Sequence, residues 1–580
     1  MTTTQPTAHA QRQSRVPRRA KSKRSAVPGG VFAALAVALA ILVVTALQPS
    51  QPPPPPVAEY APEAVQAIKQ APPEQSADAG IGDVGGANGA GGSTPTTLAG
   101  STSTTAATPP TTSAPPSGPV IEQARVRHCI GNPPRQTEDP QSPPCVAYFD
   151  PKQDNGGVTS PGVTKNEIRI TVPNTAGDRI PQLLRYFNSR YELYGRQLTL
   201  VPGGCFGGSP AGGKNLADSF AKLNIFADVG YCDVKGSEGF FFKQLARRGI
   251  VGVADKPSLS TEADLAEFHP YFWTYLPTYD KGIRHLGELS CSLNGQLASH
   301  AGPQYITAQR KFGIITATYD DAPTPDTSAI IASLKACGID PVRTEVKQER
   351  DAGATQGASQ ATIQQAQAAA LRLRQDNVTT VLVLLHSEVT KQIYATFSAQ
   401  GYQPEIGITS YLYNDQDLFF SSLPTDQSSH TFGVSTWNRF QRVADEPWYQ
   451  AMNEVDPGHV YMYAPGDYFG TNFDYRSLQV LAAGIQLAGP NLTPANFAAG
   501  LQRAKWPNPS DRSTPGKVTV APGTHSYMED SAVIWWDPTG GNSEYGGDGQ
   551  FCYVDGGKRF RFGSYPKGAP GLFTRPCQRF

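Results

Sequence analysis

The stretch Glu167-Ile-Arg-Ile-Thr-Val172 opens the part of the chain that decides the fold. Its alternating apolar residues predict a strand, which breaks at Pro173-Asn-Thr-Ala-Gly177. Further apolar runs and amphipathic segments continue this pattern up to Lys256. They predict strands at 168–172, 197–201, 225–229 and 249–254, and helices at 180–191, 214–223 and 236–248. Strands that alternate with helices form a parallel sheet with helices on both faces.

The same alternation returns in the second half. Strands are predicted at 271–275, 311–316, 341–346, 380–385 and 405–409, and helices at 280–297, 327–337, 362–374 and 387–400. Helices at 475–487 and 494–504, a strand at 531–536 and a hairpin at 551–562 follow. We therefore predict an α/β protein whose domain at 161–545 has two similar lobes facing a cleft. Lobe one covers 161–300 plus C-terminal elements, and lobe two covers 305–440.

Charge and composition limit the classes of function. The chain has 580 residues with 49 basic and 49 acidic side chains, so its formal net charge is zero. A nucleic-acid partner would favour a basic surface or a high pI, and this balance gives no argument for one. Glycine (57) and proline (51) are abundant and gather near the N-terminus, which indicates a non-globular region there.

The N-terminus predicts membrane attachment. Residues 1–30 are basic and contain no acid, and Val31–Leu47 is apolar without a charge. This length is at the lower limit for crossing a bilayer. The basic flank predicts a cytoplasmic tail at 1–30 and a single-pass helix at 31–47, with the bulk of the chain extracytoplasmic. We favour an uncleaved anchor; a cleaved and secreted chain is the alternative, with Val44 and Ala46 before the cut.

Three further segments lie outside the lobes. Residues 48–120 are rich in Pro, Gly, Ser, Thr and Ala and predict a disordered linker, because they bury too little apolar surface to offset their ordering entropy. Residues 121–160 form a short polar collar that carries cysteines, and 546–580 form a cysteine-bearing tail.

The eight cysteines all follow the apolar segment, and an even set outside the cytoplasm predicts disulfides. Cys205 and Cys232 follow two predicted strands, and parallel neighbours would bring their loops together, so we pair them. Three further pairs are predicted with less support: Cys129–Cys145, Cys291–Cys337 and Cys552–Cys577. No spacing of Cys and His suggests a metal site, and no cofactor is predicted.

Polar residues at predicted strand ends are candidate ligand contacts. Asn174 follows the first strand. Asp233 and Lys256 follow two neighbouring strands, where they could grip a zwitterion or pair with each other. Tyr411 follows the strand that ends at 409 and could close over a ligand or pack beneath a loop.

His386, Ser387 and Glu388 stand together at another strand end. They could line the cleft, or begin a helix with Ser387 as its N-cap. Adjacent residues diverge in direction, so these three do not form a catalytic triad by themselves.

The segment Gly208-Ser-Pro-Ala-Gly-Gly-Lys-Asn215 nearly matches a phosphate-binding loop. Asn215 stands where that loop needs a hydroxyl for magnesium, and Pro210 removes a backbone donor. We therefore interpret the segment as a loop that opens a helix.

At Gly162-Val-Thr-Lys-Asn-Glu-Ile-Arg-Ile170 the chain resembles the entry strand of the Leu/Ile/Val-type periplasmic solute-binding proteins of ABC transporters. The resemblance covers roughly 162–501 and is specific in the order and spacing of its segments. The further segments are Gly203–Phe206, Phe226–Asp233, Arg248–Val253, Phe272–Asp280, Lys311–Ile315, Thr380–Leu385 and Gly407–Ser410.

The resemblance implies a type I periplasmic-binding-protein fold, in which two Rossmann-like lobes joined by three crossovers hold a ligand at the hinge cleft. In that family a disulfide joins the positions of Cys205 and Cys232. Small hydroxyl residues after two lobe-one strands bind the amino acid, and a residue of lobe two completes the site. Here Asp233, Asp255 and Lys256 largely replace those hydroxyl residues. The candidate ligand-binding residues are Asn174, Asp233, Val234, Asp255, Lys256, Tyr279, Ser387, Ser410 and Tyr411.

The leading hypothesis is a membrane-tethered, extracytoplasmic solute-binding protein that serves ABC-type uptake of an amino acid or related small polar solute. Its partners would be that solute, a membrane permease and the membrane itself. The alternative is a cell-envelope sensory or protein-interaction module that uses the same fold without transport. No catalytic motif in a useful context supports an enzyme.

Overall fold

The computed structural model describes residues 128–139, 142–172, 179–203, 210–230, 240–254, 260–319, 324–347, 359–410, 414–437, 443–458, 471–503, 523–540 and 548–577. All of them belong to the second of two compact units, Pro110–Phe580. The predicted cytoplasmic tail, apolar segment and linker lie outside the described residues. Within the described ranges, no helix is both long and apolar enough to cross a membrane.

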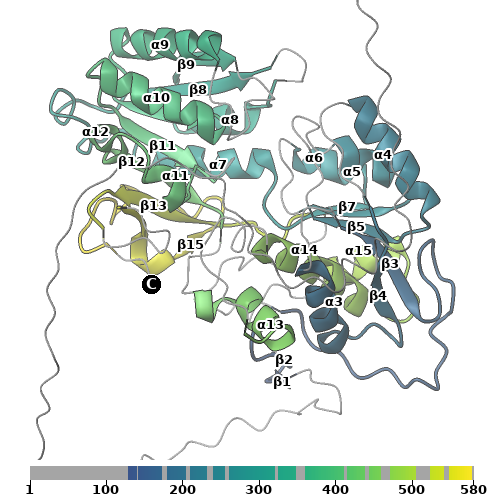
Figure 1. Ribbon diagram of the computed structural model, residues 1–580. Coiled ribbons are helices and arrows are strands. Elements are labelled where there is room, and N and C mark those ends of the chain that lie inside the picture. The colour runs from purple at the N-terminus through teal and green to yellow at the C-terminus, as the bar shows by residue number, and fades with distance from the viewer. Residues whose placement is uncertain are drawn as a thin grey trace, which may run out of the picture. The chain divides into compact units, whose positions relative to one another are not determined.

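The first sheet contains five parallel strands in the order β4-β3-β5-β6-β7 (Figure 1). The strands are β3 (Glu167–Thr171), β4 (Gln197–Leu200), β5 (Ala227–Gly230), β6 (Val251–Ala254) and β7 (Phe272–Thr274). Between them lie α3 (Arg179–Arg190), α4 (Pro210–Lys222), α5 (Phe240–Ala246) and α6 (Glu262–Glu267). Ile180, Leu183 and Phe187 form the buried face of α3, as their spacing predicts.

The second sheet repeats this order. Its parallel strands are β8 (Phe312–Thr318), β9 (Val342–Lys347), β10 (Thr380–Leu384), β11 (Glu405–Thr409) and β12 (Thr431–Ser435), arranged β9-β8-β10-β11-β12. In both sheets the second strand therefore lies outside the first, and the third lies on its other side, which is the flavodoxin-like order. The mixed α/β fold class with parallel sheets is confirmed, although β12 was not predicted.

Antiparallel strands extend the second sheet beyond β12. β13 (Ser531–Asp537) pairs with β12, and both β14 (Gln550–Tyr553) and β15 (Arg559–Phe560) pair with β13. The predicted hairpin at 551–562 is therefore wrong, because these two strands do not pair with each other. Asp555 and Gly556, both with positive φ, form an excursion within one edge strand that then rejoins β13.

The remaining helices are α7 (Tyr279–Ser292), α8 (Ser328–Ala336), α9 (Gln360–Gln375), α10 (Ser387–Ala399), α11 (Asp417–Phe420), α12 (Thr425–Ser428), α13 (Pro447–Val455), α14 (Asn472–Ala488) and α15 (Pro494–Arg503). α7 is shorter than the predicted helix at 280–297, because Leu293 caps it and Gly295 has a φ of 76°. α7 packs against β11 and β12, although we placed its residues in lobe one. α14 returns to the first sheet and packs against β5 and β6.

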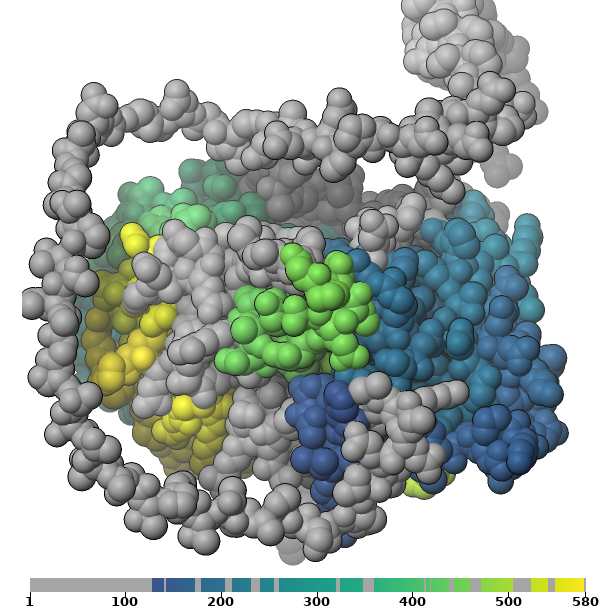
Figure 2. All heavy atoms as spheres, turned by 60° about the horizontal axis from the view of Figure 1, so that its bottom comes forward, coloured from purple at the N-terminus to yellow at the C-terminus, as the bar shows by residue number. Residues whose placement is uncertain are grey.

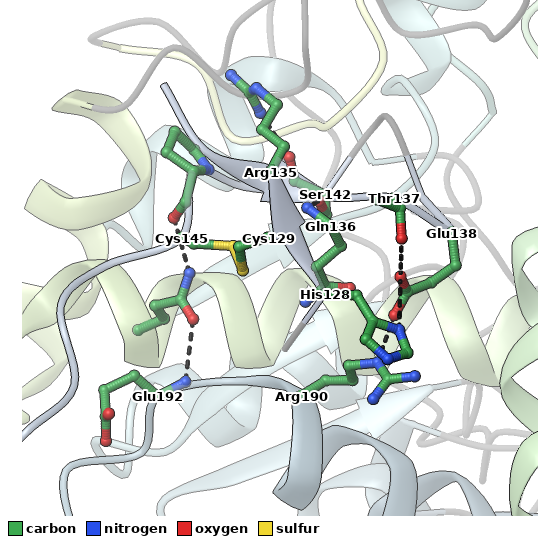
Figure 3. Close-up of a disulfide and its surroundings, with 12 residues drawn as sticks. His128, Cys129, Arg135, Gln136, Thr137, Glu138, Ser142, Cys145, Arg190 and Glu192 are labelled. Carbon is green, nitrogen blue, oxygen red and sulfur yellow. Dashed lines mark hydrogen bonds and ion pairs between the residues drawn. A yellow bond between two sulfur atoms is a disulfide. The ribbon is translucent and has the colours of Figure 1, made fainter. Parts of the chain in front are cut away.

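The described part of the collar packs against the first lobe. β1 (Cys129–Ile130) and β2 (Arg135–Gln136) form a two-stranded antiparallel ribbon that is closed by the Cys129–Cys145 disulfide (Figure 3). Glu138 accepts a hydrogen bond from Nε of the buried Arg190 on α3. Glu454 of α13 binds the same guanidinium, so α13 lies beside the collar (Figure 2).

Three predicted disulfides are present: Cys129–Cys145, Cys291–Cys337 and Cys552–Cys577. Cys205 and Cys232 lie outside the described residues, so their pairing stays a prediction. Asp537 lies near Cys552 and Cys577, but both of these sulfurs are used by the disulfide and are not available as metal ligands.

Candidate functional site

Three segments, which we call the crossing segments, carry the chain between the two sheets: 275–278, 436–471 and 504–530. The first leads from β7 to α7, the second from β12 to α14, and the third from α15 to β13. The described part of the third segment runs beside the end of β7. The amide of Thr274 donates to the carbonyl of His525, and the amide of Tyr527 donates to the carbonyl of Thr274, both at 3.0 Å.

Two buried tyrosines pack against each other where the first and third segments meet. Tyr275 directly follows β7, and its ring centroid is 5.3 Å from that of Tyr527 on the third segment. Trp437 of the second segment lies 4.8 Å from Phe473 at the start of α14. Aromatic side chains thus lie on all three crossing segments, and Tyr275 and Tyr527 pack at the carboxyl end of β7. Aromatic side chains commonly line small-molecule sites.

A buried arginine lies among these aromatic residues. Arg476, in the second turn of α14, is 1% exposed. Its Nη1 donates to Oδ2 of Asp139 at 3.2 Å and to Oε1 of Gln479 at 3.1 Å. Burial opposes the charge, but the Asp139 carboxylate raises the pKa of Arg476 overall, so the guanidinium stays protonated. Tyr275 and Tyr527 are also its electrostatic neighbours.

Several buried polar atoms that lack a partner lie on the segments around the end of β7 and the start of α14. Among the described residues, Nε and Nη2 of Arg476 meet no hydrogen-bond partner. The same holds for side-chain oxygens of Thr274, Thr278, Thr471, Asn472 and Ser477. All of these residues flank the end of β7 or begin α14. Because buried polar groups are nearly always hydrogen-bonded, such a cluster indicates a place where a ligand or water binds.

A buried acid lies where β3 and β5 meet. Oδ1 of Asp228 on β5 accepts from the hydroxyl of Thr171 on β3 at 2.5 Å. Burial raises the pKa of Asp228 to about 7, although the Thr171 hydrogen bond opposes this shift. This is the point where the strand order of the first sheet reverses, the usual ligand position in open α/β sheets.

Ser410 holds the carboxyl ends of β11 and β12 together. Its Oγ accepts from the amide of Thr436 at 2.6 Å. Nearby, Oδ2 of Asp415 accepts from the hydroxyl of Ser435 at 2.6 Å. Burial raises the pKa of Asp415 to about 6, against the hydrogen bonds from Ser435 and Ser410. The predicted ligand residue Ser410 therefore has a bracing role in this structure.

Ser387 and Tyr279 are the other predicted ligand residues that the structure describes. Ser387 is the first residue of α10, but the N-cap is His386, whose ring nitrogen accepts from the amide of Glu388. The N-cap interpretation of Ser387 is therefore wrong by one residue. Tyr279 is the first residue of α7 and lies in the apolar cluster with Ile283 and Leu286. Ligand contact at both positions stays a prediction.

The other predicted ligand residues lie outside the described residues: Asn174, Asp233, Val234, Asp255, Lys256 and Tyr411. Neither Arg476 nor Asp139 is among the residues predicted from the sequence to bind a ligand. A signal for Arg476 existed, because it is the only charged residue in the predicted helix at 475–487. A single charge in an apolar helix that is buried on most faces requires a specific partner. Asp139 lies far away in the sequence, and its partnership with Arg476 could not be read from the pattern.

Comparisons with known proteins found matches among solved structures only. No family model matches the chain, and no curated protein matches it. Solved structures do match it. Substrate-binding proteins of ABC transporters are among them. One is a solute-binding protein from R. palustris in complex with 4-hydroxybenzoate, which is 13% identical with a TM-score of 0.47, covering 70% of this chain and 99% of that one.

Two other matching structures are named after different solutes. A fatty acid ABC transporter substrate-binding protein from Thermomonospora curvata is 13% identical, with a TM-score of 0.44, covering 70% of this chain and 96% of its own. A possible leucine/isoleucine/valine-binding protein from Rhodopirellula baltica SH 1 is 12% identical, with a TM-score of 0.46, covering 67% of this chain and 96% of its own.

Proposed function

We propose that this chain is an extracytoplasmic solute-binding protein that holds a small polar solute between its two lobes and delivers it to an ABC-type permease. An N-terminal membrane anchor at 31–47 and a flexible linker at 48–120 belong to this proposal. So does the class of solute, an amino acid or a related compound. The proposal includes no chemical step on the solute.

One observation carries the proposal: two sheets of identical strand order are joined by crossing segments that gather buried, unpartnered polar atoms. A folded chain tolerates such atoms poorly, because each loses its hydrogen bonds to water without a replacement. A solute that enters between the lobes and accepts these hydrogen bonds would compensate that loss. Binding would be coupled to closure of the lobes about the crossing segments.

The test is a thermal-shift and calorimetric screen of the purified full-length chain with a panel of amino acids, organic acids and sugars. We expect at least one solute to raise the melting temperature and to titrate with a saturable heat. The proposal is contradicted if no member of the panel does so.

A matched pair of variants ties that binding to the site. Thr278→Val removes an unpartnered buried hydroxyl and keeps the shape of the side chain. We expect it to preserve or raise the stability without solute and to weaken binding several-fold, as expected for one lost hydrogen bond. Thr425→Val, at an exposed position in α12, is the control and should bind as the wild type does.

The alternative envelope module is separated from transport by crosslinking in intact cells. Recovery of a membrane permease supports uptake. Recovery of cell-wall machinery without a permease would favour the interaction module.

A further inference from the structure

Arg310 and Arg559 have buried side chains and each uses the Nε–Nη2 edge of its guanidinium to hold an acidic residue. Nε and Nη2 of Arg310 donate to the two oxygens of Glu405 at 2.7 and 2.9 Å. Nε of Arg559 donates to Oδ1 of Asp530 at 2.7 Å, and its Nη2 donates to the carbonyl of the same residue at 2.8 Å. This edge presents two parallel N–H groups that match the spacing of carboxylate oxygens.

Arg476 presents the same edge without a partner. Among the residues described, its Nε and Nη2 receive no acceptor, although the side chain is 1% exposed. The opposite edge is fixed, because Nη1 binds Asp139 and Gln479. The guanidinium is therefore held in one orientation before any ligand arrives, which lowers the entropy lost on binding.

The counter-charge of Arg476 is already shared. Oδ2 of Asp139 also accepts from the hydroxyl of Tyr475 at 3.0 Å and from Nε2 of Gln479. Oδ2 of Asp139 therefore accepts hydrogen bonds from Tyr475, Arg476 and Gln479 at the same time. A buried cation with three of its five N–H donors unmet is costly, and a second carboxylate on the open edge would supply acceptors for them.

We propose that Arg476 is the anchor for the carboxylate of a small organic acid, which it holds through Nε and Nη2. This inference rests on the proposed solute-binding function and names the class of solute. The guanidinium lies 5.3 Å from the ring of Tyr475, and Tyr275 and Tyr527 are its neighbours. The body of the acid therefore contacts aromatic side chains, which favours a flat or apolar body over a sugar. Arg476 is closed to solvent here, so the acid reaches it only when the structure opens around this side chain.

The experiment compares shape-matched probes that differ in charge. The purified full-length chain is titrated with benzoate, phenylacetate and 4-methylpentanoate, and with the corresponding amides. We expect one or more carboxylates to bind and the matched amide to bind at least about 30-fold more weakly, the loss typical of an unpaired buried charge.

Variants then assign the effect to one side chain. Arg476→Gln should lower carboxylate affinity by about 30-fold or more. Arg476→Lys keeps the charge beside Asp139 but lacks the two parallel donors, so it should remain folded and still lose most of the affinity. Arg372→Gln removes a charge from an exposed position on α9 and should bind as the wild type does.

The outcomes separate this inference from the function on which it rests. Preferential carboxylate binding that both Arg476 variants lose supports it. Binding of amides or other neutral solutes in preference to acids overturns the inference and leaves solute binding intact, as does unchanged affinity in a folded Arg476→Lys. If no probe and no member of the wider metabolite panel binds, both proposals fail.

Discussion

Nζ of Lys281 on α7 lies 2.6 Å from Oε2 of Glu262 and also binds Oε1 of Glu529. Glu262 begins α6, which packs beside β7 of the first sheet, whereas Glu529 lies just before β13 of the second. One lysine therefore connects two glutamates, one on a helix beside the first sheet and one next to a strand of the second sheet. Burial opposes its charge, but the two glutamates raise the pKa of Lys281 overall. This triad links α6 and α7 to the third crossing segment.

Replacing Lys281 tests that role. Lys281→Met leaves two partly buried glutamates without their common counter-charge, so we expect the free energy of unfolding to fall by about 3 kcal/mol. Denaturant unfolding measures the change. Lys391→Met, which removes a more exposed partner of Glu388, is the control and should cost less than about 1 kcal/mol. Equal stability of the two variants would show that the triad contributes nothing beyond a surface pair.

The Arg310–Glu405 pair should behave as a unit within the second lobe. Both side chains are buried, and Glu405 also accepts from the hydroxyl of Thr380 at 2.8 Å. Arg310→Met strands a buried carboxylate and should cost about 3–5 kcal/mol. The double variant Arg310→Met/Glu405→Gln should recover part of that loss. A double-mutant cycle in urea measures the coupling, and simple additivity of the two single losses would contradict this account.

Each disulfide should stabilise the chain by an amount that grows with the length of the loop it closes. Cys291–Cys337 spans 46 residues and Cys129–Cys145 spans 16. On the chain-entropy model, their removal by paired Cys→Ser changes costs about 4 and about 3 kcal/mol, respectively. Thermal unfolding of the two double variants checks the order. A larger loss from the shorter loop would indicate that native contacts, rather than loop closure, dominate.

Asp228 should make stability fall as pH rises. Burial raises its pKa from an ordinary 3.8 to about 7, so the folded state holds this proton more tightly than the unfolded state does. Ionising this buried carboxylate lowers the free energy of unfolding. The loss is absent below pH 4, grows between about pH 4 and 7, and reaches up to about 4 kcal/mol above that window. Asp415, whose pKa burial raises to about 6, acts in the same direction.

The variant Asp228→Asn isolates this contribution. Its neutral side chain keeps the acceptor for Thr171, so we expect stability equal to the wild type near pH 4 and higher than the wild type at pH 8. Urea unfolding across this range measures the difference. Asp376→Asn, at a position whose side chain is 44% exposed, should leave the pH profile of the wild type unchanged. A wild-type-like profile in Asp228→Asn would contradict the assignment.

The parallel sheets could be predicted because their strands carry a local signal. Ile168 and Ile170 alternate with polar residues, and apolar runs such as 380–384 are continuous, as buried parallel strands require. The second lobe's fifth strand was missed because Thr431-Phe-Gly-Val-Ser435 is short and contains glycine. The edge strand at 550–560 was misread because an excursion at Asp555 and Gly556 looks like a turn in sequence.

The candidate site was less predictable because its contacts join distant parts of the chain. Arg476 and Asp139 are 337 residues apart in the sequence, and no local sequence pattern predicts that they form a pair. The ligand residues predicted from the sequence did not include Arg476, and of the described ones Ser410 braces two strands and Tyr279 lies in an apolar cluster. Burial and unpartnered atoms depend on the folded chain, so they could appear only with the structure.

Amide hydrogen exchange of the full-length chain, with and without a pooled panel of small metabolites, tests the central claim most directly. Solute binding between the lobes predicts slower exchange at 275–278, 471–477 and 525–530 together, because all three crossing regions would close around the same molecule. Exchange that is unchanged there, or slowed in one lobe alone, would contradict a solute held between the two sheets.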